Sequence, residues 1–399
     1  MKFKYKAKNN EGETIKGVLE SNSHDEAASL LKEKRLYVVD LKEEGTKSQF
    51  EKIFQKKVTV KDKIVFTEQL GIMIKSGLSI IEALEALQEE TVNKYFGSQI
   101  AEVIVDVQGG TPLSKALEKH QDSFSEIYIS MIKSGEESGK LDVVFQRLSV
   151  QLGKEYDLTR KIRGALAYPV FVLVALVIVM IIILTFVIPQ LKLIFDDAGV
   201  PLPLLTRAVM GLSMIIKNYG IYIFAFLAII VVLLIRFKKT EKGKHIYDSL
   251  IIKLPVFGTL LKKTYMARFT RSFAALISAG LPLLDVLRVT GNTIGNVLYK
   301  KEIENMTVSI KSGQPISQTL KKSPLFPKMI GQLAIVGEKS GSLDEVFDTL
   351  ANFFERDVDN ITSNLSALLE PILMVVLAVG IGLVIVSVLQ PIYGLVNAI

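Results

Sequence analysis

The chain has 399 residues, of which 49% are hydrophobic and 22% are charged. This composition is too apolar for an ordinary soluble protein and too charged for a transporter made of many membrane spans, so it favours a protein that lies partly in a membrane. Cysteine is absent, which excludes disulfide bonds, thiolate metal sites and cysteine nucleophiles. The net charge of +7 comes from basic residues beside apolar segments, a pattern typical of membrane flanks and not of a nucleic-acid-binding surface.

The N-terminal residues alternate between apolar and polar side chains, from Phe3 to Ala7 and again from Thr14 to Leu19. Two such runs separated by a turn predict a β-hairpin. Ser23, with Glu26 three residues later, predicts the start of a helix, and Leu36 to Leu41 predicts a closing strand. We expect a small mixed unit here, followed by a polar linker.

From Val58 onward, apolar residues recur at intervals of three and four, which is the pattern of amphipathic helices. A break at Gly77 predicts a turn between two helices, and Gly109-Gly110 predicts the end of another. Tyr128 to Lys133 predicts a short helix before the last one of the group. This stretch is expected to fold as an antiparallel helical bundle with short loops.

Three apolar segments are long enough to cross a bilayer: Val170 to Ile188, Tyr219 to Ile235, and Ile372 to Leu389. Basic residues precede the first segment and follow the second, so the N-terminus is expected in the cytoplasm and the C-terminus outside it. The localisation predicted from this pattern is the cytoplasmic membrane, with several passes.

The predicted fold is mainly α-helical, with two homologous antiparallel bundles in the cytoplasm, three transmembrane helices and a small N-terminal α+β unit. In chain order we expect the N-terminal unit over residues 1–41, a linker over 42–57, the first bundle over 58–168, a span over 169–189, an extracytoplasmic segment over 190–218, a second span over 219–235, the second bundle over 236–366, a third span over 370–390, and an extracytoplasmic C-terminus over 391–399.

The chain contains an internal repeat of more than a hundred residues. Adding 203 to a residue number relates Phe66 to Phe269, and adding 202 relates Gly135 to Gly337. The segment from Gly135 to Phe145 recurs almost unchanged from Gly337 to Phe347. Similarity in the same order over such a length indicates a duplicated module.

Each copy contains a Gly-Glu-x-Ser-Gly-x-Leu-Asp segment, which we interpret as a turn between two helices. The residues that define it are Gly135, Glu136, Gly139, Asp142, Gly337, Glu338, Gly341 and Asp344. In one interpretation the paired carboxylates form an ion site or a partner contact. In the other, the second glycine permits a tight turn and the aspartate offsets the dipole of the next helix. No histidine or third acid lies at metal-ligand spacing, which favours the second interpretation.

Two residue pairs mark the starts of the first and third spans, Tyr168-Pro169 and Glu370-Pro371. Proline is well accommodated at the first position of a helix, which would explain both prolines. Glu370 is a carboxylate at the expected membrane boundary, where it needs solvent or a partner. A helix N-terminus there would stabilise it, so a structural and a functional role are about equally expected.

The sequence lacks the common catalytic motifs. Gly135 to Lys140 is one residue short of a phosphate-binding loop, and Leu141 stands where a Ser or Thr would hold magnesium. There is no Gly-x-Ser-x-Gly or His-Glu-x-x-His motif, and the three histidines are far apart. We therefore expect no enzyme activity, no cofactor and no metal.

Several of these motifs together resemble the inner-membrane platform protein family of type II secretion systems (protein F) and type IV pilus assembly machines. The motifs are Phe66-Thr67-Glu68-Gln69-Leu70, Ser76-Gly77-Leu78, the two Gly-Glu-x-Ser-Gly-x-Leu-Asp segments, Tyr168-Pro169 and Glu370-Pro371. The resemblance covers essentially the whole chain. The second copy departs from the first motif, since it has Thr270-Arg271-Ser272-Phe273.

The resemblance implies a non-enzymatic protein that forms homo-oligomers in the cytoplasmic membrane. It also implies partners: a hexameric assembly ATPase, pilin or pseudopilin subunits, other inner-membrane assembly proteins and membrane lipid, but no nucleic acid. We expect mechanical transmission through continuous helices, because no loop is evident between Leu148 and Tyr168 or between Phe353 and Glu370.

Two other classes remain as alternatives. A repeat-built transporter would need charged groups or matched broken helices within its spans, and the three apolar segments have neither. A membrane signalling protein would need an outer sensing domain, and the segment from Leu191 to Asn218 is short for one.

Overall fold

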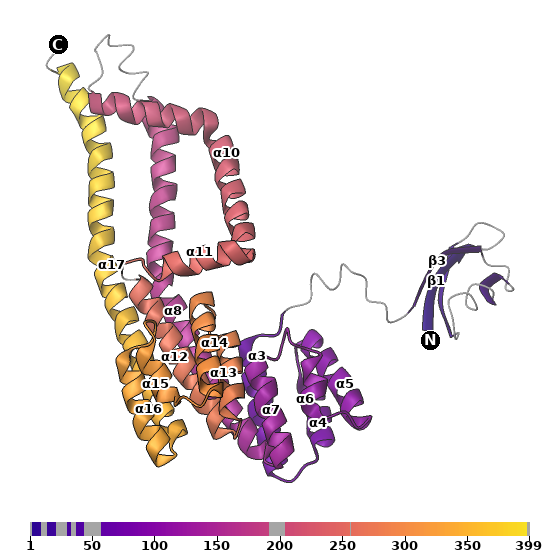
Figure 1. Cartoon of the computed structure of the whole chain (residues 1–399). Helices are drawn as coiled ribbons and strands as arrows, with labels where there is room; N and C mark the ends of the chain where they lie inside the picture. Colours follow the sequence, from indigo (N-terminus) through magenta and orange to yellow (C-terminus); the bar gives the residue numbers. More distant parts are fainter. Residues whose placement is uncertain are drawn as a thin grey trace. The chain divides into compact units, whose positions relative to one another are not determined.

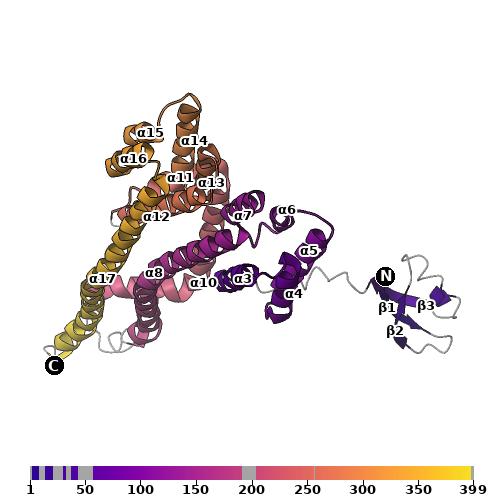
Figure 2. The same ribbon diagram turned by 90° about the horizontal axis from the view of Figure 1, so that it is seen from below.

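A computed structural model describes residues 2–8, 14–20, 30–32, 37–43, 57–190, 204–255 and 257–396. By its internal contacts the chain divides into two compact units, residues 1–59 with 88–101, and residues 60–87 with 102–399. The protein is mainly α-helical. Figure 1 shows the helices and strands in chain order, and Figure 2 shows them from below.

The N-terminal residues form a three-stranded antiparallel sheet in the order β2-β1-β3. Its strands are β1 (Lys2–Lys8), β2 (Thr14–Glu20) and β3 (Tyr37–Glu43). The alternating residues pair as a hairpin, with Phe3 opposite Leu19. Most of the helix expected after Ser23, and most of the linker expected over 42–57, lie outside the described residues, so the complete N-terminal unit stays a prediction.

Over the described residues, each repeat contains six helices in the same order. In the first repeat they are α3 (Val60–Lys75), α4 (Ile80–Glu90), α5 (Lys94–Gln108), α6 (Leu113–Glu118), α7 (Glu126–Ser138) and α8 (Leu141–Ile182). In the second they are α12 (Phe257–Ser278), α13 (Leu283–Thr293), α14 (Val297–Lys311), α15 (Ile316–Lys322), α16 (Lys328–Ser340) and α17 (Leu343–Val396).

The repeat is also visible in the cores. Phe269 of α12 lies against Phe326, with ring centroids 4.7 Å apart, and Phe273 stacks on Phe347 at 3.9 Å. In the first repeat Phe66 faces Phe124 at 6.1 Å. All of these rings are at most 4% exposed. The pairs Phe66–Phe124 and Phe269–Phe326 occupy equivalent positions, so in each copy the first helix packs on the loop that precedes the fifth helix.

Helix α7 is longer than the sequence predicts. The periodicity indicated Tyr128 to Lys133, whereas the helix begins after its N-cap Ser125 and ends at Gly139, which has a left-handed φ of 69°. The prediction stopped early because Gly135 was taken as the beginning of a turn. Gly135 is instead inside the helix, and Gly139 with Lys140 forms the turn.

The two longest helices continue through the predicted span boundaries. Helix α8 passes Pro169 without a break, and α17 runs over 54 residues through Pro371. The prediction that these prolines occupy first helical positions is therefore wrong. Each proline removes one backbone hydrogen bond, a loss that a long helix held by packing on both sides can tolerate, and such prolines also occur in membrane helices.

Two helices are long and apolar enough to cross a membrane, judged by length and composition within the described residues: 141–190 and 207–239. The second is α10 (Leu204–Lys239), which begins well before the predicted span at Tyr219. Their apolar side chains are largely exposed, as with Phe171 at 72% and Phe224 at 76%. The third predicted span lies within α17, where many side chains are not described, and it stays a prediction.

The first apolar helix changes pitch before it ends, at a π-helical turn η1 (Ile183–Val187). The hydroxyl of Ser213 in α10 donates a hydrogen bond to the carbonyl of Leu184. Leu184 and Met210 also share a small buried cluster. Because a π-turn displaces backbone groups from their usual partners, this side chain from α10 compensates for the irregularity.

Candidate functional site

In each repeated segment, the glutamate that follows the first glycine caps a helix that lies earlier in the sequence. Glu136 accepts hydrogen bonds from the amides of Leu113 and Ser114, at 2.5 and 3.0 Å. These amides begin α6, whose N-cap Pro112 has no side-chain acceptor to offer. A carboxylate on unsatisfied amides at a helix N-terminus is stabilised both by the hydrogen bonds and by the helix dipole.

The second copy repeats this contact. Glu338 accepts from the amide of Ile316 at 2.7 Å and also from the amide and hydroxyl of Ser317. The helix that it caps, α15, follows Pro315 in the same way. Equivalent caps in two copies indicate that the glutamate was kept for a structural reason.

The glycines of the segment are explained by close packing and by backbone conformation. A Cβ atom on Gly135 would lie 2.9 Å from a methyl carbon of Val144, and one on Gly337 would lie 3.0 Å from Leu343. Gly139 and Gly341 have φ values of 69° and 70°, which favour glycine. The structure therefore explains Gly135 and Gly337 by close packing, and Gly139 and Gly341 by their backbone conformation.

The aspartates of the segment do not join the glutamates. Asp142 and Asp344 lie in the first turns of α8 and α17, where a negative charge is favourable. Within the described residues, no group of three or more His, Cys, Asp or Glu side chains is arranged to hold a metal ion. The dipole interpretation of the aspartates agrees with these positions, while a partner contact at the turn stays a prediction.

We expect Glu136→Ala to destabilise the start of α6 by about 1 to 2 kcal/mol, because two amides lose their acceptor. Amide hydrogen exchange of residues 113 and 114 should become faster in the variant. Glu137→Ala is the matched control: its side chain is 69% exposed and pairs with Lys133 only at 3.9 Å. Equal exchange at α6 in both variants would show that the cap has no such role.

The residues predicted at the membrane boundaries differ in how far they are exposed. Tyr168 is 57% exposed, and Pro169 beside it is buried. Pro371 is exposed on α17, and the side chain of Glu370 lies outside the described residues. Because α17 begins at Leu343, Glu370 does not lie at the start of its own helix, so that explanation of its position is wrong.

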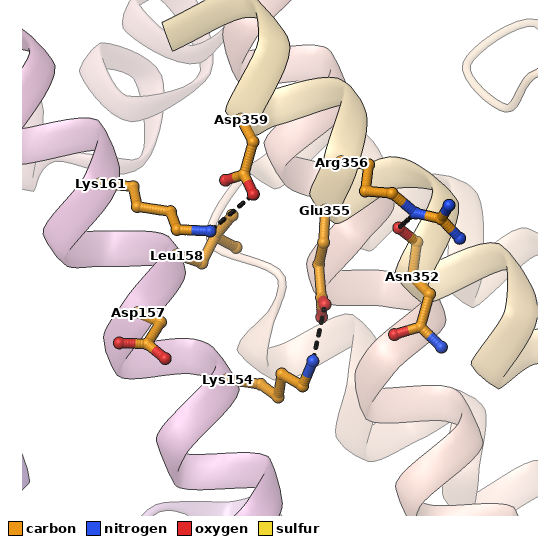
Figure 3. A pocket seen from close by; sticks show the side chains of 8 residues that line it. All are labelled: Lys154, Asp157, Leu158, Lys161, Asn352, Glu355, Arg356 and Asp359. Carbon is orange, nitrogen blue, oxygen red and sulfur yellow. Dashed lines mark hydrogen bonds and ion pairs between the residues drawn. The ribbon is translucent and has the colours of Figure 1, made fainter. Parts of the chain in front are cut away.

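A charged contact between the repeats was missed in the sequence. Just before their apolar halves, α8 and α17 lie side by side, and their facing side chains line a cleft of about 310 Å³ (Figure 3). Lys154 of α8 approaches Glu355 of α17 at 3.7 Å, and Lys161 pairs with Asp359 at 2.5 Å. The signal was present in the spacing: the two lysines are seven residues apart on one helix face, and the acids are four apart on the other.

Arg271 of α12 extends this contact into the second repeat. It is 9% exposed, donates to Glu355 at 2.7 and 3.0 Å, and donates to Asn352 at 2.7 Å. It also pairs with Asp348. Burial alone would lower the pKa of Arg271, but Glu355 and Asp348 outweigh burial and raise that pKa, so the guanidinium is always charged. We call Lys154, Lys161, Arg271, Asp348, Glu355 and Asp359 the junction network.

Three residues of the junction network, Arg271, Asp348 and Glu355, have no charged counterpart of the same sign in the first copy. Arg271 stands where the first copy has Glu68, which is exposed. By the offset of 202, Asp348 and Glu355 stand where the first copy has Gln146 and Gly153. The second copy therefore differs from the first in its charges at the face that meets α8 of the first copy.

A second contact joins the repeats away from the junction network. Glu126 at the start of α7 accepts from Arg288 of α13 at 2.8 Å and from Asn292 at 3.1 Å. The hydroxyl of Ser134 donates to the carbonyl of Ala279 at 2.6 Å. Residues 60–87 and 102–399 thus form one body in which both repeats are held together at two places.

Comparison with known proteins accounts for this duplicated architecture. The sequence model of the type II secretion system protein F domain matches residues 66–189 and, a second time, residues 269–391. The chain belongs to the type II secretion system protein F family. The N-terminal domain of the same family matches residues 1–42. The two matches begin at Phe66 and Phe269, the pair that the internal repeat relates, so the resemblance inferred from the motifs is confirmed.

Members of this family from two kinds of machine are similar to the chain over nearly their full lengths. The type IV pilus assembly protein PilC of Thermus thermophilus is 34% identical, over 100% of this chain and 98% of that protein. The type IV pilus assembly protein TapC of Aeromonas hydrophila is 31% identical, over 98% and 95%. The type II secretion system protein F of Xanthomonas campestris is 29% identical, over 100% and 99%.

Proposed function

We propose that the protein is the non-enzymatic inner-membrane platform of a type IV pilus or type II secretion machine. In this proposal the helical repeats lie in the cytoplasm and bind a hexameric assembly ATPase. The apolar helices contact pilin or pseudopilin subunits in the membrane, and the chain forms homo-oligomers. The names of the similar proteins, which come from both machines, support this class of function.

The observation that carries the proposal is the continuity of α8 and α17. Each helix begins inside a repeat and runs on into an apolar segment with no intervening loop (Figure 1). A rigid helix transmits a tilt or a rotation along its whole length, whereas a flexible linker would absorb it. A movement imposed on the repeats would therefore reach the membrane segments.

The junction network supports the same proposal because it holds the two helices together where they leave the repeats. The pairs Lys154–Glu355 and Lys161–Asp359 connect α8 to α17, and Arg271 fixes α17 to its own repeat. A load on one repeat would then act on both helices together. We propose that the two repeats work as one lever and not as two independent handles.

The proposed topology has the N-terminus in the cytoplasm, three spans and an extracytoplasmic C-terminus. The basic residues that end α10, Arg236, Lys238 and Lys239, support a cytoplasmic location for that end. A cytoplasmic location of the second repeat follows, because it continues directly from these residues.

Deletion of the gene and affinity purification test the function together. We expect deletion to abolish pilus assembly or secretion in the source organism and the wild-type gene to restore it. Tagged protein solubilised in mild detergent should co-purify with a hexameric assembly ATPase. Normal filaments or secretion after deletion would refute the proposal. Substrate flux through the purified protein in vesicles would favour the transporter alternative instead.

A further inference from the structure

The short helix α11 (Glu241–Ile251) exposes apolar side chains although it lies beside a folded repeat. Ile246 is 49% exposed and Leu250 is 61% exposed, and Leu254, which follows the helix, is 51% exposed. In Figure 1, α11 crosses the end of α10, between the long apolar helices and the second repeat. Helix α11 therefore exposes apolar side chains at the place where the apolar helices meet the second repeat.

One side of α11 is attached to the second repeat. Asp248 is 4% exposed, and its carboxylate accepts a hydrogen bond from the amide of Val297 at 2.9 Å, at the start of α14. The side chain of Asn296 donates to the backbone carbonyl of Asp248 at 3.4 Å. Ile252, which follows the helix, is also buried. These contacts fix the rotation of α11 about its own axis.

The other side of α11 faces the end of α10. Gly243 packs so closely that a Cβ atom there would lie 1.9 Å from the carbonyl oxygen of Phe237. The ammonium group of Lys238 lies 3.8 Å from the centre of the Tyr247 ring. Leu250 follows Gly243 and Tyr247 at helical spacing, so it lies on this same side. The exposed apolar residues of α11 thus point toward the side of the molecule from which α10 arrives.

Basic residues surround this apolar side. They are Arg236, Lys238, Lys239, Lys242 and Lys244, and all five are exposed. Among the described residues, none of these cations has a carboxylate within ion-pair distance. Helix α11 contains two acids: Glu241 is exposed in its first turn, and Asp248 is turned into the repeat. With five cations and one exposed acid, the surface consequently combines apolar side chains with an excess of positive charge.

We propose that α11 and the last turn of α10 form a binding surface for the anionic phospholipid headgroups of the bilayer. In this arrangement Ile246 and Leu250 enter the boundary between headgroups and acyl chains, and the basic side chains contact the phosphates. The surface is continuous with α10, whose apolar side chains are exposed up to Leu234 and Ile235, at 60% and 54%. This continuity and the charge favour lipid as the occupant over a protein. The proposal rests on the membrane location given under the proposed function.

The surface also gives α11 a mechanical role. Its one side is fixed to α14 of the second repeat, and its other side would lie on the lipid. Arg236 to Lys244 would then set the depth and tilt of the second repeat relative to the bilayer. A repeat supported in this way can rotate relative to the membrane while its distance from the bilayer stays the same.

Spin labels on single cysteines test the location of α11, and the natural chain has no cysteine that would interfere. The full chain would be reconstituted in nanodiscs of phosphatidylcholine with and without phosphatidylglycerol. Labels would be placed by Leu250→Cys, by Phe224→Cys within α10, and by Val308→Cys, an exposed aliphatic position of the second repeat at 67%. The collision rate of each label with a water-soluble nickel chelate measures its exposure to water.

We expect the label at 250 to collide with the nickel chelate at least about threefold less often than the label at 308 when phosphatidylglycerol is present. Equal rates at 250 and 308, with the label at 224 protected, would overturn the lipid surface while leaving the membrane location intact. A label at 224 that is as accessible as the one at 308 would overturn the membrane location itself.

The charge requirement is tested with the triple substitution Lys239→Gln, Lys242→Gln and Lys244→Gln. Each lysine near an anionic surface contributes about a fivefold preference, so the variant should lose the protection at 250 that phosphatidylglycerol adds. Protection that is equal in neutral lipid, in anionic lipid and in the triple variant would overturn the proposal, because neither the anionic headgroups nor the lysines would then contribute to it.

Discussion

A flexible Gly-Ser insertion after Arg163 is expected to abolish filament assembly or secretion while the protein still reaches the membrane. Arg163 is exposed within α8, beyond the junction network and before the apolar half of the helix. The insertion leaves both repeats and the spans intact but replaces the rigid connection between them with a flexible one. The same insertion after Ser366, within α17, should have the same effect.

Filaments or secreted substrate would be measured in cells, together with the amount of protein in the membrane fraction and its co-purification with the assembly ATPase. The control is the same insertion after Gly313, a loop residue with a φ of 87° and open space around it. The control should retain assembly. Normal assembly with the insertion after Arg163 would contradict mechanical transmission through α8.

The second large effect is expected at the centre of the junction network. Arg271→Met should lower the melting temperature of the detergent-solubilised protein by roughly 5 to 10 °C. The physical reason is that Glu355, whose side chain is only 16% exposed, would lose its closest cation. A buried charge without its partner costs much more than an exposed one, because the surroundings cannot solvate it.

Arg288→Met is the matched control for this substitution. Arg288 also joins the two repeats, through Glu126 at 2.8 Å, but its side chain is 58% exposed. Because exposed pairs contribute at most about 1 kcal/mol, its melting temperature should fall by only about 2 °C. The double variant Arg271→Met, Glu355→Met should recover much of the lost stability, since neither charge then remains buried. Equal melting temperatures for the two single variants would contradict this account.

The contrast between Arg271 and Glu68 shows how a duplicated module becomes specialised. Both copies share the aromatic pair Phe66–Phe124 and Phe269–Phe326 in their cores, but they differ in charge where the two copies meet. At one equivalent position the first copy has an exposed acid, and the second has a buried base that holds α17. In the folded chain, charged pairs such as Lys161–Asp359 and Arg288–Glu126 join the two similar bundles.

The sequence alone determined the duplicated helical architecture. Apolar periodicity and composition act over short distances along the chain, so they identified the helices, the repeat and the apolar segments. The Gly-Glu-x-Ser-Gly-x-Leu-Asp motif could be recognised as structural from its glycines. The family could be inferred from the order of the motifs.

Only the tertiary structure decided which residues these elements bring together. The carboxylate of Glu136 could be noticed in the sequence, but its partners lie 22 and 23 residues earlier, at the start of another helix. Arg271 and Glu355 are 84 residues apart, and their contact depends on how α12 packs on α17. Pro169 and Pro371 were misjudged because a local rule for helix starts cannot register the packing that carries a helix through a proline. Local patterns report the elements, whereas side-chain pairs between elements exist only after the elements have packed.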